Sequence, residues 1–90
     1  MTSHPMNRAT LEALVAAGAI RQVRIIADGF AVYIKITTQA GETSTVTTNK
    51  GGIKNWVTID ASARWVKGLG VGRAQLEISR WLPGQRGMTL

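Results

Sequence analysis

Apolar and polar residues alternate through much of the first half of the chain, which predicts two adjoining β-strands. The β-rich runs 21–27 and 30–38 are separated by the dipeptide Asp28-Gly29. A two-residue Asp-Gly loop between two such runs is typical of a type I′ hairpin turn. The pattern therefore predicts an antiparallel hairpin with Asp28-Gly29 at its tip.

The turn also fixes which residues share a face of the hairpin. It predicts an apolar face on which four pairs lie opposite each other: Ala27 and Phe30, Ile25 and Val32, Val23 and Ile34, Arg21 and Ile36. The other face, in contact with solvent, is predicted to carry Gln22 beside Lys35, Arg24 beside Tyr33, and Ile26 beside Ala31. One face is thus expected to form the core and the other to be polar and basic.

A third strand is predicted over residues 42–48, after a turn that contains Ala40-Gly41. A two-residue turn would place Val46 beside Lys35, on the solvent-facing side. One additional loop residue places Val46 opposite Ile36, because a one-residue slip exchanges the two faces of a strand. We therefore predict a three-residue connection with Gly41 in a bulge. The outward-facing residues of this strand are then Thr45 and Thr47.

Helical spacing of apolar residues predicts two helices. The first covers residues 8–17, with Asn7 as its N-cap. The second starts after a cap at Thr58 or Asp60 and ends near Leu69. Its buried stripe is expected to contain Ser62, Trp65, Val66 and Leu69.

The remaining segments complete a small α+β domain. A short extended piece is predicted over 53–57 and a last strand over 73–81, with Ala74, Leu76 and Ile78, and Arg80 as a further candidate, on one side. We expect one domain over residues 8–82, with flexible tails at 1–7 and 83–90. The predicted architecture is an antiparallel sheet of three to five strands with two helices on one face.

Composition excludes several classes of chemistry. The chain has 90 residues, of which 44% are hydrophobic and 18% charged, and it has no cysteine. A disulfide framework, a thiolate zinc site and thiol catalysis are therefore excluded. The longest apolar candidate, residues 11–20, is interrupted by Glu12 and Gly18 and is too short for a membrane helix. We expect a cytoplasmic protein without a membrane partner.

The sequence offers little for catalysis. His4 is the only histidine and lies in the expected N-terminal tail, while Asp28 and Asp60 have structural roles in a turn and at a helix start. No cluster of acidic residues or histidine has the spacing of metal ligands. The glycine-rich run 68–72 follows a helix and precedes a strand, the reverse of a dinucleotide-binding loop. We expect no enzymatic activity, no cofactor and no metal.

The charge balance favours a polyanionic partner or simply solubility. Eleven Lys and Arg against five Asp and Glu give a formal net charge of +6. The candidate nucleic-acid-binding residues are Arg24, Tyr33 and Lys35 on the solvent-facing side of the hairpin, with Lys50 and Lys54 near its end. The cations would contact phosphates and the tyrosine would stack on a base or sugar. The alternative is an ordinary solvated face of a sheet covered on its other side only.

The three tryptophans suggest a second kind of site. Trp65 and Trp56 are expected to pack in or near the core, whereas Trp81 ends the last strand beside Leu82. Because tryptophan is enriched at interfaces, Trp81 and Leu82 are candidates for self-association. The alternative is that Trp81 covers an edge of the core.

Two stretches carry a resemblance to a known family. They are the opening segment 10–20, with its Ala17-Gly18-Ala19, and the later pair Ile59-Asp60-Ala61 and Leu69-Gly70-Val71. Together they resemble the small ParC-type partition-associated proteins of plasmids and integrative elements. The resemblance implies an accessory role near DNA segregation or element maintenance, with no active site to carry over. The Thr-rich third strand departs from it, since that strand is more basic in the family.

These observations leave two functional hypotheses of different classes. The first is a non-enzymatic accessory protein of a plasmid or mobile element that acts by binding DNA or a partition partner. The alternative is a protein-interaction module, a homodimer, that does not bind nucleic acid.

Overall fold

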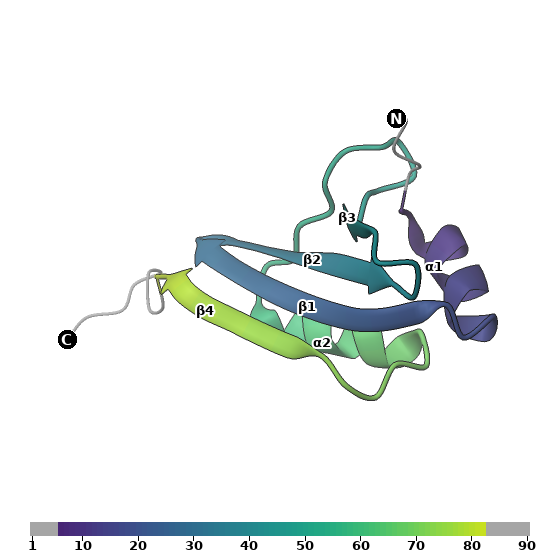
Figure 1. Ribbon diagram of the computed structural model, residues 1–90. Coiled ribbons are helices and arrows are strands. Elements are labelled where there is room, and N and C mark those ends of the chain that lie inside the picture. The colour runs from purple at the N-terminus through teal and green to yellow at the C-terminus, as the bar shows by residue number, and fades with distance from the viewer. Residues whose placement is uncertain (1–5, 83–90) are drawn as a thin grey trace.

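The computed structural model describes residues 6–82, which form one small α+β domain, as expected (Figure 1). The expected flexible segments, apart from Met6 and Asn7, lie outside the described residues. The helices are α1 (Arg8–Ala16) and α2 (Ile59–Gly68). The strands are β1 (Ile20–Gly29), β2 (Ala31–Thr38), β3 (Thr43–Thr45) and β4 (Gln75–Trp81), in the spatial order β3-β2-β1-β4.

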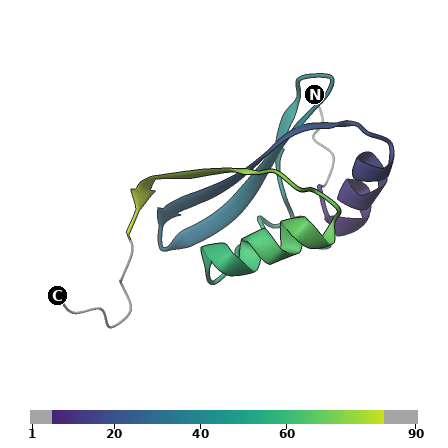
Figure 2. The same ribbon diagram turned by 90° about the horizontal axis from the view of Figure 1, so that it is seen from below.

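Both helices lie on the same side of the sheet, which we call the inner face (Figure 2). Helix α2 lies beneath the strands, and α1 closes the end of the sheet at which β1 begins. The opposite, helix-free side is called the outer face. The core between the helices and the sheet consists of Met6, Leu11, Val23, Ile25, Ala27, Val32, Ile34, Ile36, Val46, Val66 and Leu69.

The β1–β2 hairpin turns one residue later than predicted. Asp28 pairs with Ala31, so the loop is Gly29-Phe30 instead of Asp28-Gly29. Gly29 has φ +61° and Phe30 a negative φ, a combination that fits a type II′ turn, which requires glycine at its first central position. Phe30 consequently lies at the tip, 71% exposed, and not on the apolar face.

The change of turn replaces every predicted pair but preserves the faces. Ala27 lies opposite Val32, Ile25 opposite Ile34, and Val23 opposite Ile36. Because each residue of β1 pairs with the β2 residue two positions after the predicted one, inward positions stay inward. The apolar face is therefore confirmed except at its two ends, Arg21 and Phe30, both of which are exposed.

The predicted three-residue connection to the third strand is confirmed. The Thr38 N–H donates to the Glu42 carbonyl at 2.9 Å, which leaves residues 39–41 as the loop, and Gly41 has φ +92°. Val46 is fully buried, as predicted. Its N–H donates to the carbonyl of Ile34, so its neighbour is Ile34 and not Ile36. Strand β3 itself has only three residues, fewer than the predicted range 42–48.

Strand β4 differs from the prediction in direction. It pairs with β1 in parallel, so the sheet is mixed and not purely antiparallel. The chain passes beneath the sheet as α2 before β4 begins, and a crossover of this kind is the usual route to a parallel neighbour. The strand starts at Gln75, two residues after the predicted start.

Two β-bulges move arginines that simple alternation placed on the inner face. In β1 the register shifts between Ile20 and Gln22, so that Arg21 is the extra residue and is exposed. In β4 the register shifts before Arg80, which lies beside Asp28 instead of following Ile78 on the inner face. A bulge of this kind re-aims side chains and ends the strict alternation of a strand.

Side-chain caps begin both helices where the sequence predicts them. The Asn7 Oδ1 accepts from the Thr10 N–H, and the Thr58 Oγ1 accepts from the Ala61 N–H, each at 3.0 Å. The predicted stripe of α2 faces the core, with Ser62, Val66 and Leu69 buried. Met6, the first described residue, has a buried side chain, and its carbonyl accepts from the Thr47 N–H.

The extended piece before α2 closes the β3 side of the sheet. Ile53 forms an isolated bridge with Thr47, and Trp56 forms another with Val32. The Trp56 ring meets the Trp65 ring of α2 edge-on, with 5.1 Å between their centroids. Both tryptophans pack against the core, as expected.

Candidate interaction surfaces

The outer face carries a row of polar residues across the sheet. Thr45, Lys35, Arg24 and Gln75 are successive neighbours in the register of β3, β2, β1 and β4. The structure thus places Arg24 directly opposite Lys35, and not beside Tyr33 as predicted. Tyr33 is the neighbour of Ile26, one step further along the hairpin.

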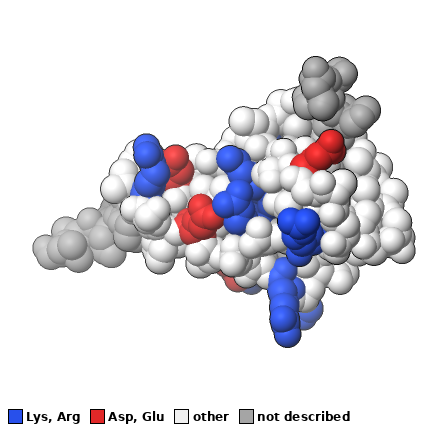
Figure 3. All heavy atoms as spheres, viewed as in Figure 1, with Lys and Arg blue, Asp and Glu red and all other residues white. Residues whose placement is uncertain are grey.

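Carboxylates neutralise two of the arginines on this face. Arg24 Nη1 lies 2.7 Å from Glu77 Oε2, and Arg80 Nε lies 3.1 Å from Asp28 Oδ1. Figure 3, which looks onto the outer face, shows acidic groups beside the cations towards the end of β4. Of the predicted residues on this face, Lys35 is the cation that forms no ion pair within residues 6–82.

The structure does not bring Lys50 and Lys54 to the row. Lys50 lies in the exposed turn that the Gly51 N–H closes on the Thr48 carbonyl. The Lys54 ammonium lies 5.3 Å from the centre of the Trp56 ring, which packs against α2. Of the five predicted nucleic-acid-binding residues, the outer face therefore unites Arg24, Tyr33 and Lys35.

Two cations that the sequence did not single out lie close to this row. Arg21 and Arg73 line one open groove of about 480 Å³, together with Gln22 and Gln75. The sequence pattern does not show that Arg21 is exposed, because a bulge, and not the alternation, sets the direction of its side chain. Arg73 lies in the loop before β4, where residues have no periodicity to interpret.

Strand β4 is exposed along its whole length. Leu76 and Ile78 are each 48% exposed, and the strand ends at Trp81, directly before Leu82. We call Leu76, Ile78, Trp81 and Leu82 the β4 strip. Trp81 is 37% exposed and is not among the buried core residues. The Leu82 N–H donates to the Gly29 carbonyl, which holds the end of the strip against β1.

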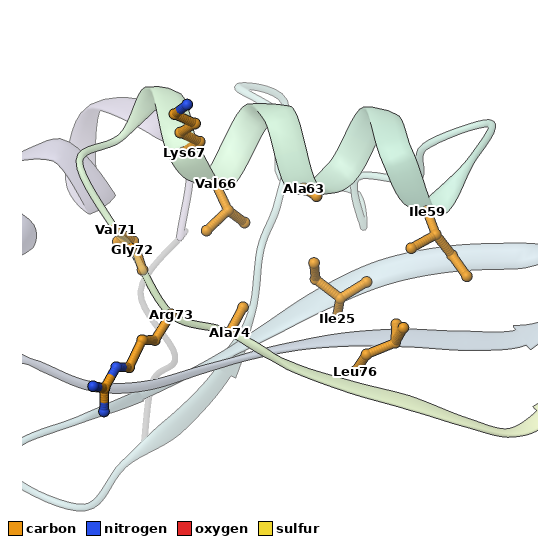
Figure 4. Close-up of a pocket in the computed structure, with 10 residues that line it drawn as sticks. All are labelled: Ile25, Ile59, Ala63, Val66, Lys67, Val71, Gly72, Arg73, Ala74 and Leu76. Atoms are coloured by element: carbon orange, nitrogen blue, oxygen red, sulfur yellow. The ribbon is translucent and has the colours of Figure 1, made fainter.

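An open apolar groove of about 430 Å³ continues the β4 strip beneath the sheet. In Figure 4, Ile25, Ala74 and Leu76 point from the sheet towards α2, and Ile59 and Val66 point back from the helix. The two cations at its rim, Arg73 and Lys67, point away from it. The groove thus opens between α2 and β4: Ile25 and Val66 on its walls belong to the core, and Leu76 is shared with the exposed strip.

The described residues show no further candidate chemistry. No group of three or more His, Asp or Glu within 6–82 is placed to hold a metal ion. Neither helix in this part of the chain is long and apolar enough to cross a membrane. His4, the single histidine, lies outside the described residues.

Comparisons with protein-family models, curated proteins and solved structures gave no match.

Proposed function

We propose that this chain is a non-enzymatic protein-interaction module that forms a homodimer through β4. The single observation that carries the proposal is the exposure of all seven β4 residues, including the aliphatic side chains of Ile78 and of Leu76, which points towards α2 in Figure 4. Monomeric proteins seldom leave a contiguous apolar surface next to an unpaired sheet edge, because both invite association.

The geometry of an edge strand favours a second copy as the partner. β4 hydrogen-bonds to β1 on one side, and in residues 6–82 no strand pairs with its other side. An antiparallel pair of β4 strands about a two-fold axis normal to the sheet would satisfy both edges with the same chemistry. It would also place the two β4 strips on the same face, where apolar meets apolar.

The charges of β4 are compatible with such a seam in spite of the basic net charge. Glu77 and Arg80 are its two charged residues, and each forms an ion pair with β1 in its own chain. The strip itself, Leu76, Ile78, Trp81 and Leu82, carries no charge. A second copy therefore brings no unpaired charge of β4 to the interface.

The size of a stable interface implies that more than the strand is buried. Specific interfaces bury about 1,600 Å² in total. A seven-residue strand alone is too small for this, so the interface must include the neighbouring groove and the Trp81–Leu82 end of the strip.

We further propose that the dimer acts as an accessory protein of a plasmid or mobile element. The resemblance of residues 10–20 and 59–71 to partition-associated proteins supports this role, and the partner in that setting is a partition protein. An interaction module without catalytic groups fits an accessory role of this kind.

Sedimentation velocity over a range of concentrations tests the homodimer. The 9.7-kDa chain is expected to shift towards twice its mass as concentration rises to several hundred micromolar. Ile78→Lys places a charge in the strip and should hold the chain as a monomer. Ile53→Lys is the matched control, because Ile53 is 58% exposed but lies outside the strip, and it should leave the dimer intact.

A wild-type chain that stays monomeric throughout would reject the homodimer. Equal loss of association in both lysine variants would show that added charge, and not the β4 strip, controls association. Both side chains are substantially exposed, so both variants are expected to fold. Circular dichroism of each variant checks this.

A further inference from the structure

A row of cations crosses the outer face and continues around the start of β1. Lys35 and Arg24 lie opposite each other at its centre, and Arg21 and Arg73 line the adjoining groove. Figure 3 shows Lys and Arg over the middle of this face, where an acidic group adjoins them, and further Lys and Arg towards its edge. We call these four residues, Lys35, Arg24, Arg21 and Arg73, the cation row.

The fold directs the two outer members of the row to this surface. The bulge in β1 makes Arg21 the extra residue of the strand, so that its side chain is exposed instead of entering the core. Figure 4 shows Arg73 pointing away from α2 and from the apolar groove. Both side chains line the groove that the outer-face residues Gln22 and Gln75 also line.

Three members of the row form no ion pair with another described residue. Four of the five carboxylates of the chain lie in ion pairs with Arg8, Arg24, Arg64 and Arg80. Arg21, Lys35 and Arg73 form none within residues 6–82. The contact of Arg21 is with the Gln39 carbonyl, at the long distance of 3.5 Å. The positive charge of these three groups is therefore not neutralised within the described part of the chain.

The donors around the groove are those that phosphate oxygens accept. Guanidinium groups offer paired N–H donors that match phosphate geometry. Among the residues that line the groove, the Gln22 amide donates to the Gln75 Oε1 at 2.7 Å, which holds the two glutamine side chains together and leaves the Gln75 amide N–H groups available as donors. An anion in the groove would accept from both arginines and from this amide.

The shape of the surface favours a long anion over a small one. Sites for small molecules enclose most of their ligand, whereas this groove is open and its cations form a row instead of converging on one point. We propose that the cation row binds the phosphate backbone of a nucleic acid, with Arg21 and Arg73 as its principal contacts. Contacts to phosphates carry no sequence information, so the binding is expected to tolerate any sequence.

Fluorescence anisotropy with a labelled mixed-sequence DNA duplex at 50–200 mM KCl tests the proposal. The double variant Arg21→Ala/Arg73→Ala should weaken binding by about 10-fold or more at the lowest salt. The slope of log K against log[KCl] should fall in magnitude by about 2, since each lost phosphate contact removes roughly one counterion. Both arginines are exposed, so thermal unfolding should be unchanged.

The matched control is Lys50→Ala/Lys54→Ala, which removes the same charge from the loop beyond β3. It should change the affinity by less than about 3-fold, as expected for charges away from the contact surface. An equal effect of the two double variants would show that net charge alone drives binding and would overturn the assignment. Absence of any complex with wild-type protein at 50 mM KCl would reject nucleic-acid binding altogether.

Further arms of the same assay identify the ligand. Single-stranded DNA and duplex RNA distinguish the sources of the phosphate backbone, and binding of any one of them supports the proposal. Poly-L-glutamate is the competitor that tests whether the row prefers phosphate over carboxylate. If, at equal charge, poly-L-glutamate displaces the labelled DNA as well as unlabelled DNA does, the row binds acidic proteins and the proposal is overturned. The Ile78→Lys variant should bind like wild type per chain, because the row lies within one chain, so this result is independent of the homodimer.

Discussion

The two halves of the sheet follow the same alternation of apolar residues but differ sharply in burial. In β2 and the segment after β3, Val32, Ile34, Ile36 and Val46 are all at most 3% exposed. In β4, the corresponding Leu76 and Ile78 are 48% exposed. An apolar face therefore becomes core only where another element lies against it, and the alternation alone does not show where that happens.

Length explains why the cover is incomplete. Helix α2 has ten residues and extends about 15 Å at 1.5 Å per residue. Strand β1 also has ten residues but extends about 33 Å at 3.3 Å per residue. The helix packs against β1 and β2, and the end of the sheet at Gly29 and Trp81 projects beyond it (Figure 2).

The largest expected effect is a loss of stability on truncation of a core residue in the covered half of the sheet. Ile34→Ala removes a fully buried side chain and should lower the free energy of unfolding by about 3 kcal/mol, within the usual 2–5 kcal/mol for such truncations. Ile78→Ala is the matched change in the open half. In the monomer it should cost less than about 1 kcal/mol, because roughly half of the side chain is already in water.

Urea unfolding at low micromolar concentration, where the monomer dominates, measures both values. Equal costs for the two alanine variants would show that Ile78 is buried in the monomer, and the contrast between the halves would then be wrong.

A smaller effect concerns the helix that forms the cover. Thr58→Ala removes the cap that accepts from the Ala61 N–H and should cost about 1 kcal/mol. Thr58→Ser keeps a hydroxyl oxygen at the cap and should restore most of this stability. Urea unfolding of the two variants side by side decides the point: a serine variant as unstable as alanine would mean that the cap hydrogen bond contributes little.

The fold could be predicted from sequence where local chemistry dominates. Asn7 and Thr58 cap their helices as predicted, and Val46 points into the core after a three-residue loop. The hairpin turn lies one residue later than predicted because Gly29 can also take the first central position of a type II′ turn. The direction of β4 depends on how the chain crosses the sheet, which no local pattern encodes.

The candidate sites were predictable only in part. Arg24 and Lys35 were placed on the right face because they follow the alternation, but the pairing of Arg24 with Glu77 joins residues 53 positions apart. Arg21 was placed in the core because a bulge cannot be seen in the alternation. Trp81 was a candidate for self-association from its residue type alone, and the exposure of the rest of β4 appeared only with the structure.

The most direct test of the homodimer is hydrogen–deuterium exchange at two protein concentrations, about 1 μM and about 500 μM. Pairing of β4 with a second copy predicts that the amides of residues 75–81 become protected at the higher concentration. Those of β3, at the other edge of the sheet, should exchange at the same rate in both samples. Exchange in β4 that does not depend on concentration, in a chain that remains folded, would contradict the assignment of β4 as the dimer interface.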